Sequence, residues 1–212
     1  MSTKLSTLNF QMNKRPTPKE VDKACYNALA ALGVQLKYGL GTWPIDEHFS
    51  GWIGLNQGVH PTFVRVNPNI GIHCVAVMKL VAEARGVKYR KGEYPTHSCF
   101  IGTRCPDVLQ LIFENEADLL PEATRLAEII DQYGVPYIHS LASYDALLPL
   151  LHADVDNGDG FSATYAAALY LSGDTQGAFR FLEEQSAKYL EKKFTHGIEA
   201  LSKLRLCLEA KQ

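Results

Sequence analysis

Histidines and cysteines are the side chains best suited to chemistry in this 212-residue chain. His97 and Cys99 stand two residues apart in a run that predicts a strand, so both are expected on one face of it. Cys99 could act as a nucleophile with His97 or His73 as its base, the arrangement of a small cysteine-dependent hydrolase or transferase. No local catalytic signature accompanies them, and buried strand positions are the simpler explanation. We therefore expect no catalytic residue and keep these three as an alternative.

No metal or other cofactor is expected. Zinc sites need four converging ligands, usually in pairs about two to four residues apart, and His97 with Cys99 is the single pair of this kind. The aspartate-rich run 154–160 fits neither register of an EF-hand calcium loop, so it predicts a solvated loop between helices. The cysteines are odd in number and widely spaced, which favours reduced, buried thiols: they are Cys25, Cys74, Cys99, Cys105 and Cys207.

Nucleic acid is an improbable partner on the sequence. Motifs that cradle phosphates, bind dinucleotides or expose a catalytic serine are absent. The basic run Lys88-Tyr89-Arg90-Lys91 could contact phosphates, but the whole chain is mildly acidic, with a net charge of −2. A solvated loop after a helix, or an internal partner for the acidic segment, is the simpler interpretation of that run.

The charge of the chain is unevenly distributed along the sequence. Residues 107–159 contain eleven acidic side chains and one basic one, Arg125, which gives this segment a charge of −10. The first 106 residues have a charge of +7 and the last 53 a charge of +1. An uneven charge distribution of this size is informative about partners and solubility rather than about fold. It indicates a basic protein partner.

Seven side chains are expected to contact that partner. Five are carboxylates on the solvent side of a predicted helix or in the loop that follows a later one, and two are tryptophans, a residue type frequent among interface anchors. The tryptophans are equally suited to covering a sheet edge. The seven are Glu128, Asp131, Asp154, Asp156, Asp159, Trp43 and Trp52.

Hydrophobic periodicity and turn residues predict an α+β fold: an antiparallel sheet of about five strands with packed helices, followed by an all-helical C-terminal part. Residues 57–60 are expected to form a turn, and Gly134 to end a helix. We expect a flexible arm over 1–16, an α+β part over 17–142 and a docked helical part over 143–212, together one compact unit. Helices are predicted over 17–32, 72–85, 118–133, 143–152, 162–171, 175–189 and 195–209, and strands over 34–38, 51–56, 62–66, 97–102 and 108–113.

Two resemblances accompany this pattern. Residues 162–189 resemble a single tetratricopeptide-like helical hairpin, because small alanines and Gly173-Asp174 occupy its contact and turn positions. The order of an N-terminal helix, an antiparallel sheet carrying a helix, and a helical tail also resembles small uncharacterised bacterial immunity-type domains. That second likeness implies an inhibitor that docks on a toxin.

The chain is expected to be cytoplasmic and free of membrane contact. Its first residues contain no apolar run typical of a secretory signal, and no window approaches the roughly 18 apolar residues of a membrane span. The leading expectation is a non-enzymatic protein-binding module, in concrete form an immunity-type inhibitor whose acidic surface docks on a basic partner. The alternatives are the cysteine-dependent enzyme and a scaffold that receives a peptide in a groove of residues 162–209.

Overall fold

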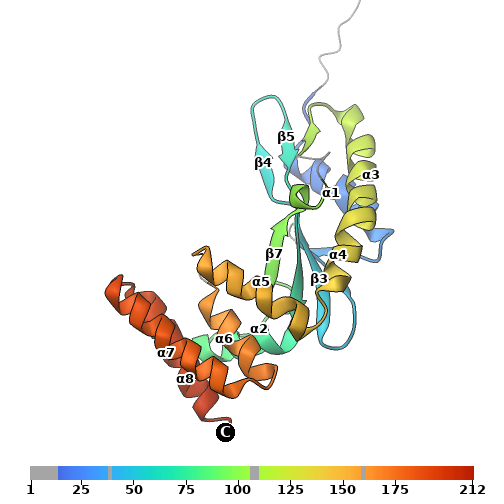
Figure 1. Ribbon diagram of the computed structural model, residues 1–212. Coiled ribbons are helices and arrows are strands. Elements are labelled where there is room, and N and C mark those ends of the chain that lie inside the picture. The colour runs from blue at the N-terminus through green and yellow to red at the C-terminus, as the bar shows by residue number, and fades with distance from the viewer. Residues whose placement is uncertain (1–13, 38–39, 106–109, 159–160) are drawn as a thin grey trace, which may run out of the picture.

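The computed structural model describes residues 14–37, 40–105, 110–158 and 161–212, so nearly all of the predicted arm over 1–16 lies outside the described residues. An α+β part and a helical part follow each other along an elongated molecule (Figure 1). The helices are α1 (Pro18–Ala30), α2 (Val75–Arg85), α3 (Leu119–Ile129), α4 (Val135–Ser140), α5 (Tyr144–Asp156), α6 (Ser162–Leu171), α7 (Thr175–Glu191) and α8 (Thr195–Glu209). The strands are β1 (Gln35–Lys37), β2 (Leu40–Pro44), β3 (Phe49–Gly54), β4 (Gln57–Val59), β5 (Val64–Val66), β6 (Asn69–Cys74), β7 (His97–Phe100) and β8 (Leu111–Phe113).

The predicted fold class is confirmed. The main sheet has five strands in the order β1-β2-β3-β6-β7, all paired antiparallel. A second sheet has the order β4-β5-β8. The predicted strands 62–66 and 108–113 belong to this second sheet, as β5 and β8, and the five-stranded sheet is completed instead by β2 and β6.

Three local predictions were wrong. Residues 57–59, expected in a turn, form β4 and pair with β5. Residues 69–74 form β6, a strand inside the main sheet between β3 and β7, and the helix predicted from residue 72 begins only at Val75. Gly134, expected to end a helix, lies in a π-helical turn (Ile130–Gly134) that joins α3 to α4. Its backbone is helical, with φ −74° and ψ −54°.

Helix α1 begins where the sequence predicts it. The Thr17 hydroxyl accepts from the Glu20 backbone N–H, the Glu20 carboxylate accepts from the Thr17 backbone N–H, and Pro18 occupies the first turn. One face of α1 is fully buried, at Val21, Cys25 and Leu29. This face joins α1 to the core, and α1 lies beside α3 (Figure 1).

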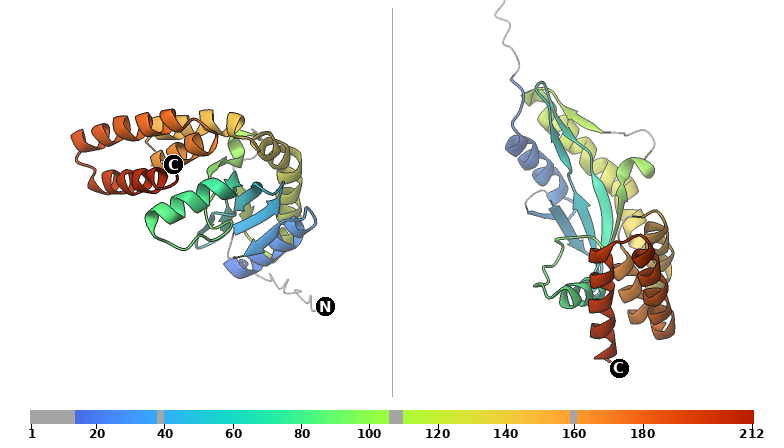
Figure 2. Two further views of the ribbon diagram at one scale, coloured as in Figure 1. Left: turned by 90° about the horizontal axis from the view of Figure 1, so that it is seen from below. Right: turned by 90° about the vertical axis from the view of Figure 1, so that its left-hand side faces the viewer.

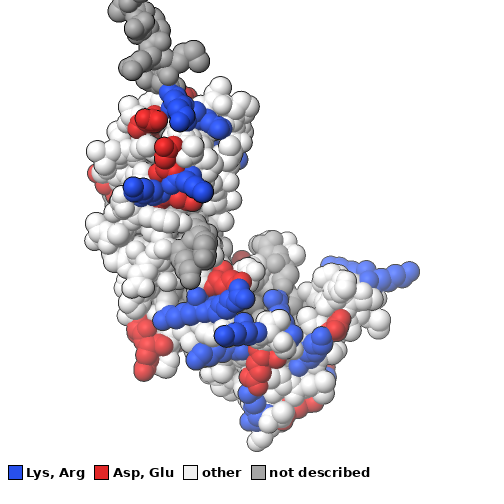
Figure 3. All heavy atoms as spheres, turned by 180° about the vertical axis from the view of Figure 1, so that it is seen from behind, with Lys and Arg blue, Asp and Glu red and all other residues white. Residues whose placement is uncertain are grey.

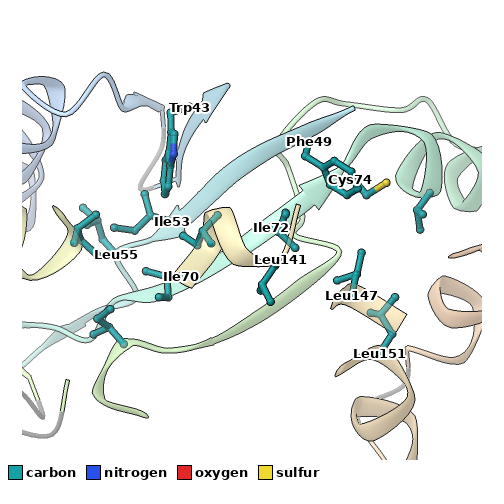
Figure 4. Close-up of a cluster of buried hydrophobic side chains, with 14 of the residues drawn as sticks. Trp43, Phe49, Ile53, Leu55, Ile70, Ile72, Cys74, Leu141, Leu147 and Leu151 are labelled. Carbon is teal, nitrogen blue, oxygen red and sulfur yellow. The ribbon is translucent and has the colours of Figure 1, made fainter. Parts of the chain in front are cut away.

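One face of the main sheet is covered by helical segments. Directly opposed residues on neighbouring strands share a face, so the register groups Ile53 with Ile70. Both are fully buried, and the turn at Gly134 lies over Ile70. Figure 4 shows Ile70 and Ile72 on the side of the sheet that faces Leu141. The turn at Gly134 and the helices α4 and α5 therefore cover this face.

The helical part contains α2 in addition to the last four helices. Helix α2 continues directly from β6 and contacts both α6 and α8 (Figures 1 and 2). Helix α7 follows α6 in the sequence and contacts both α6 and α8. The helices predicted over 162–171, 175–189 and 195–209 are present with nearly these bounds. Among the described helices, none has the length and apolar character needed to cross a membrane.

Candidate functional site

Glu128 and Asp131 lie at the surface, as the sequence predicts. Glu128 is on α3 and Asp131 on the π-helical turn after it, and both side chains are exposed. No Lys, Arg or His among the described residues forms an ion pair with either of them. Arg125, the one basic residue of the segment, lies 3.5 Å from Glu122 instead. These two carboxylates are therefore available to a cation from outside.

The same two carboxylates border a hollow of about 290 Å³ between α1 and α3. Its remaining surface is mostly apolar, contributed by small or aliphatic side chains that are exposed or half-buried. We call this feature the acidic hollow; it is lined by Ala28, Ala31, Leu32, Thr124, Ala127, Glu128 and Asp131. The sequence indicated the carboxylates, whereas the contribution of α1 depends on tertiary packing.

The three other predicted carboxylates do not extend this surface. Asp159 lies outside the described residues. Asp156 is exposed at the end of α5, with its carboxylate 3.2 Å from Nδ1 of His152. Asp154 belongs to α5 rather than to a loop, and its carboxylate lies 2.7 Å from Nδ1 of His97. The four described carboxylates of the predicted five are thus divided between α5 and the segment formed by α3 and the π-helical turn after it.

Both tryptophans are part of the core. Trp43 is 7 % exposed, and its indole lies against Gly51 of the adjacent strand. Trp52 is 8 % exposed and donates from Nε1 to the carbonyl oxygen of Gly92 at 3.0 Å. Trp52 also lines a hollow of about 450 Å³, together with Asp22. Neither indole stands out as an exposed anchor for a partner.

His73 is held in a structural role. Its side chain is buried, with Nδ1 2.7 Å from the Tyr94 carbonyl oxygen and Nε2 2.8 Å from the Tyr89 hydroxyl. A carbonyl only accepts, so Nδ1 donates and Nε2 accepts from the phenol. Burial lowers the pKa of His73. Because alternate residues of a strand face opposite sides, His73 points away from the face of Ile72, and it is not a base for Cys99.

His97 and Cys99 share a face of β7, as the sequence predicts. They are paired with Ile72 and Ile70, so both point toward the side covered by α4 and α5. His97 is buried and bonded to Asp154 from α5, while Cys99 is half-buried. No local pattern indicated the contact between His97 and Asp154, which are 57 residues apart.

Two further side chains surround the Cys99 thiol. The Arg104 guanidinium lies over the Tyr137 ring, 3.9 Å from its centroid, and also contacts Cys99. Burial and the neighbouring Cys99 raise the pKa of Tyr137. Its hydroxyl is buried without a hydrogen-bond partner in the described structure. We call His97, Cys99, Arg104, Tyr137 and Asp154 the β7 cluster. No sequence motif marks Arg104 or Tyr137 as a neighbour of Cys99.

The basic run at 88–91 is at the surface. Lys88, Arg90 and Lys91 are exposed, and Arg90 lies 3.6 Å from Glu93. On the face opposite to that of Figure 1, Lys and Arg are numerous in the lower part of the molecule, with Asp and Glu among them (Figure 3). The mixture of signs is that of an ordinary solvated surface.

The helical part exposes three large apolar side chains, Leu190, Phe194 and Leu206. They belong to the end of α7, the α7–α8 turn and α8. A peptide groove in this part stays a prediction from the sequence.

Comparisons with protein-family models, with curated proteins and with solved structures found no match. Within the described ranges, no three His, Cys, Asp or Glu side chains converge so that they could hold a metal ion.

Proposed function

We propose that the protein is a non-enzymatic protein-binding module, and that the acidic hollow receives a basic side chain of its partner. The observation that carries the proposal is the pair of exposed carboxylates, Glu128 and Asp131, at the border of an apolar hollow; no cation of the described residues forms an ion pair with them.

The chemistry of the hollow suits arginine. The guanidinium group pairs with carboxylates through two parallel hydrogen bonds, and its aliphatic stem covers apolar surface. Ala127 and Leu32 offer such a surface beside Glu128. A lysine would supply the charge but not the bidentate geometry.

The finer proposal is an immunity-type inhibitor of a toxin. Enzymes that act on nucleic acids or nucleotides have positively charged clefts, and an acidic surface complements such a cleft and raises the association rate. The −10 charge of residues 107–159 supports this choice of partner class. The resemblance in element order to immunity-type domains points in the same direction.

The test is affinity capture from the native host with three matched baits. The first is the wild type, the second carries Glu128→Lys and Asp131→Lys, and the third carries Glu184→Lys and Glu191→Lys. The third bait makes the same change in net charge at exposed carboxylates of α7, away from the hollow. We expect one stoichiometric basic partner on the first and third baits, lost from the second and released by salt. Equal capture by all three baits, or none, contradicts the proposal.

A further inference from the structure

The hollow beside Trp52 is a second feature that could receive a ligand. Its volume is about 450 Å³, within the range of roughly 300–1,000 Å³ that is usual for small-molecule sites. Its walls come from α1, β2, β3, β6 and the residues that lead from β3 into β4. We call this feature the Trp52 hollow; it is lined by Asp22, Leu40, Trp52, Gly54, Leu55, Asn56, Gln57 and Asn69.

The Trp52 side chain forms a fixed apolar wall of this hollow. Its Nε1 donates to the Gly92 carbonyl oxygen at 3.0 Å. Its six-membered ring lies over Gly54, where an added Cβ would be 2.7 Å from Cη2. Gly54 opposes Leu40 on one neighbouring strand and Asn69 on the other, so all four residues share one face of the sheet. The hollow therefore has an apolar wall with an amide beside it.

The polar groups around the hollow are mainly acceptors. The Gln57 amide nitrogen donates to Asp22 Oδ1 at 2.8 Å and to the Pro18 carbonyl oxygen at 3.2 Å. An amide nitrogen has two hydrogens, so the Gln57 side chain has only its Oε1 acceptor left for a ligand. The second oxygen of Asp22 and the amide oxygens of Asn56 and Asn69 are further acceptors. The site therefore suits a ligand that is rich in donors.

The charge of the hollow favours a cationic ligand. Among the described residues, no Lys or Arg lines the hollow or forms an ion pair with Asp22. Asp22 is half-buried, and burial raises its pKa, which is the effect of desolvation without a compensating charge. A bound cation would supply that charge.

We propose that the Trp52 hollow binds a small primary amine. An ammonium group has three N–H donors that can reach separate acceptors, here the oxygens of Asp22, Gln57 and Asn69, while the carbon chain of the amine lies against Leu40 and Trp52. A guanidinium group suits the site less well, because Gln57 already occupies one of the two Asp22 oxygens that a bidentate pair requires.

This site is independent of the acidic hollow. The two hollows share no lining residue, and the amine is bound without any reaction, in keeping with a non-enzymatic protein. Both experiments below use the protein alone, so their failure is distinct from a failure to capture a basic protein partner.

The first experiment titrates the isotope-labelled full-length protein with n-butylamine, at a pH of about 7 where an alkylamine is protonated as lysine is, and follows the indole N–H signals by NMR. Trp43 opposes Gly51 and so lies on the other face of the sheet from Trp52, which makes its signal an internal control. We expect a saturable shift of the Trp52 signal and none of the Trp43 signal.

Two analogues of the same chain length separate charge from donors in that titration. Neutral n-butanol and butyltrimethylammonium, which has the charge without N–H donors, should each bind at least about tenfold more weakly than n-butylamine. The absence of a saturable Trp52 shift, an equal shift of Trp43, or equal affinity for either analogue overturns the proposal. This comparison needs no substitution, so it decides the proposal even where a variant fails to fold.

The second experiment repeats the titration with Asp22→Asn, which retains an oxygen that can accept from Gln57 but removes the charge. We expect the Kd of n-butylamine to rise at least about tenfold. Glu184→Gln makes the same change in charge at an exposed carboxylate of α7 and should leave the Kd unchanged. Equal Kd values for the two variants overturn the assignment of Asp22.

Discussion

The Asp154 carboxylate on α5 accepts a hydrogen bond from Nδ1 of His97 on β7, at 2.7 Å. This contact joins the first helix of the predicted C-terminal part to the edge of the main sheet. It also removes Asp154 from the set of surface carboxylates and gives it a partner 57 residues away.

Breaking this pair should destabilise the fold. Asp154→Ala leaves a buried imidazole N–H without an acceptor, which costs about 1–3 kcal/mol. Asp156→Ala, on the same helix but exposed, should change the free energy of unfolding by less than about 0.5 kcal/mol. Urea unfolding monitored by circular dichroism measures both. Equal changes in the free energy of unfolding for the two substitutions would show that the Asp154–His97 pair does not stabilise the fold.

His73 should make the fold sensitive to acid. Burial lowers the pKa of His73 in the folded state, while the unfolded chain titrates near the usual value of about 6.5. Below that value the unfolded state binds more protons than the folded state, so the free energy of unfolding falls as the pH falls. Above that value His73 is neutral in both states and does not change the free energy of unfolding with pH. His73→Gln retains a donor and an acceptor and removes the titration. The difference in unfolding free energy between pH 7 and pH 5 should shrink in this variant.

The control is His48→Gln, because the His48 side chain is 68 % exposed. This substitution should leave the acid dependence as it is in the wild type. If His73→Gln has the same acid dependence as His48→Gln, His73 is not the group responsible.

Two glycines should respond in opposite directions to the same substitution. A Cβ at Gly51 would lie 2.1 Å from the Trp43 indole, so Gly51→Ala should cost about 1–3 kcal/mol. A Cβ at Gly134 meets nothing closer than 3.5 Å, and the backbone there is helical. Gly134→Ala should therefore stabilise the protein by roughly 0.5–1 kcal/mol. Thermal unfolding of both variants tests this, and a shift of the same sign in both would refute it.

The sequence predicts elements well where local chemistry marks their ends. The Thr17–Glu20 capping box places α1, and Ser143, whose hydroxyl accepts from Ala146, places the start of α5. Strand β6 has no such mark, because Cys74 passes into Val75 without a turn residue. A short apolar run that is buried on both sides does not distinguish a strand from a helix.

The candidate site residues also differ in whether local sequence patterns predict them. The solvent side of α3 follows from helical periodicity, so Glu128 and Asp131 could be placed at the surface from the sequence. The Asp154–His97 contact and the approach of Arg104 to Cys99 depend on long-range packing. No local pattern in a single sequence encodes such contacts.

The central claim is that the acidic hollow binds a basic partner. The most direct measurement is the Kd of the captured partner over a range of NaCl concentrations, for the wild type, for Glu128→Gln with Asp131→Asn, and for the α7 control Glu184→Gln with Glu191→Gln. We expect the hollow variant to bind at least about tenfold more weakly, ~1.4 kcal/mol, and with a smaller salt dependence. The α7 control should match the wild type. Equal Kd values and equal salt dependence in all three proteins would contradict the claim.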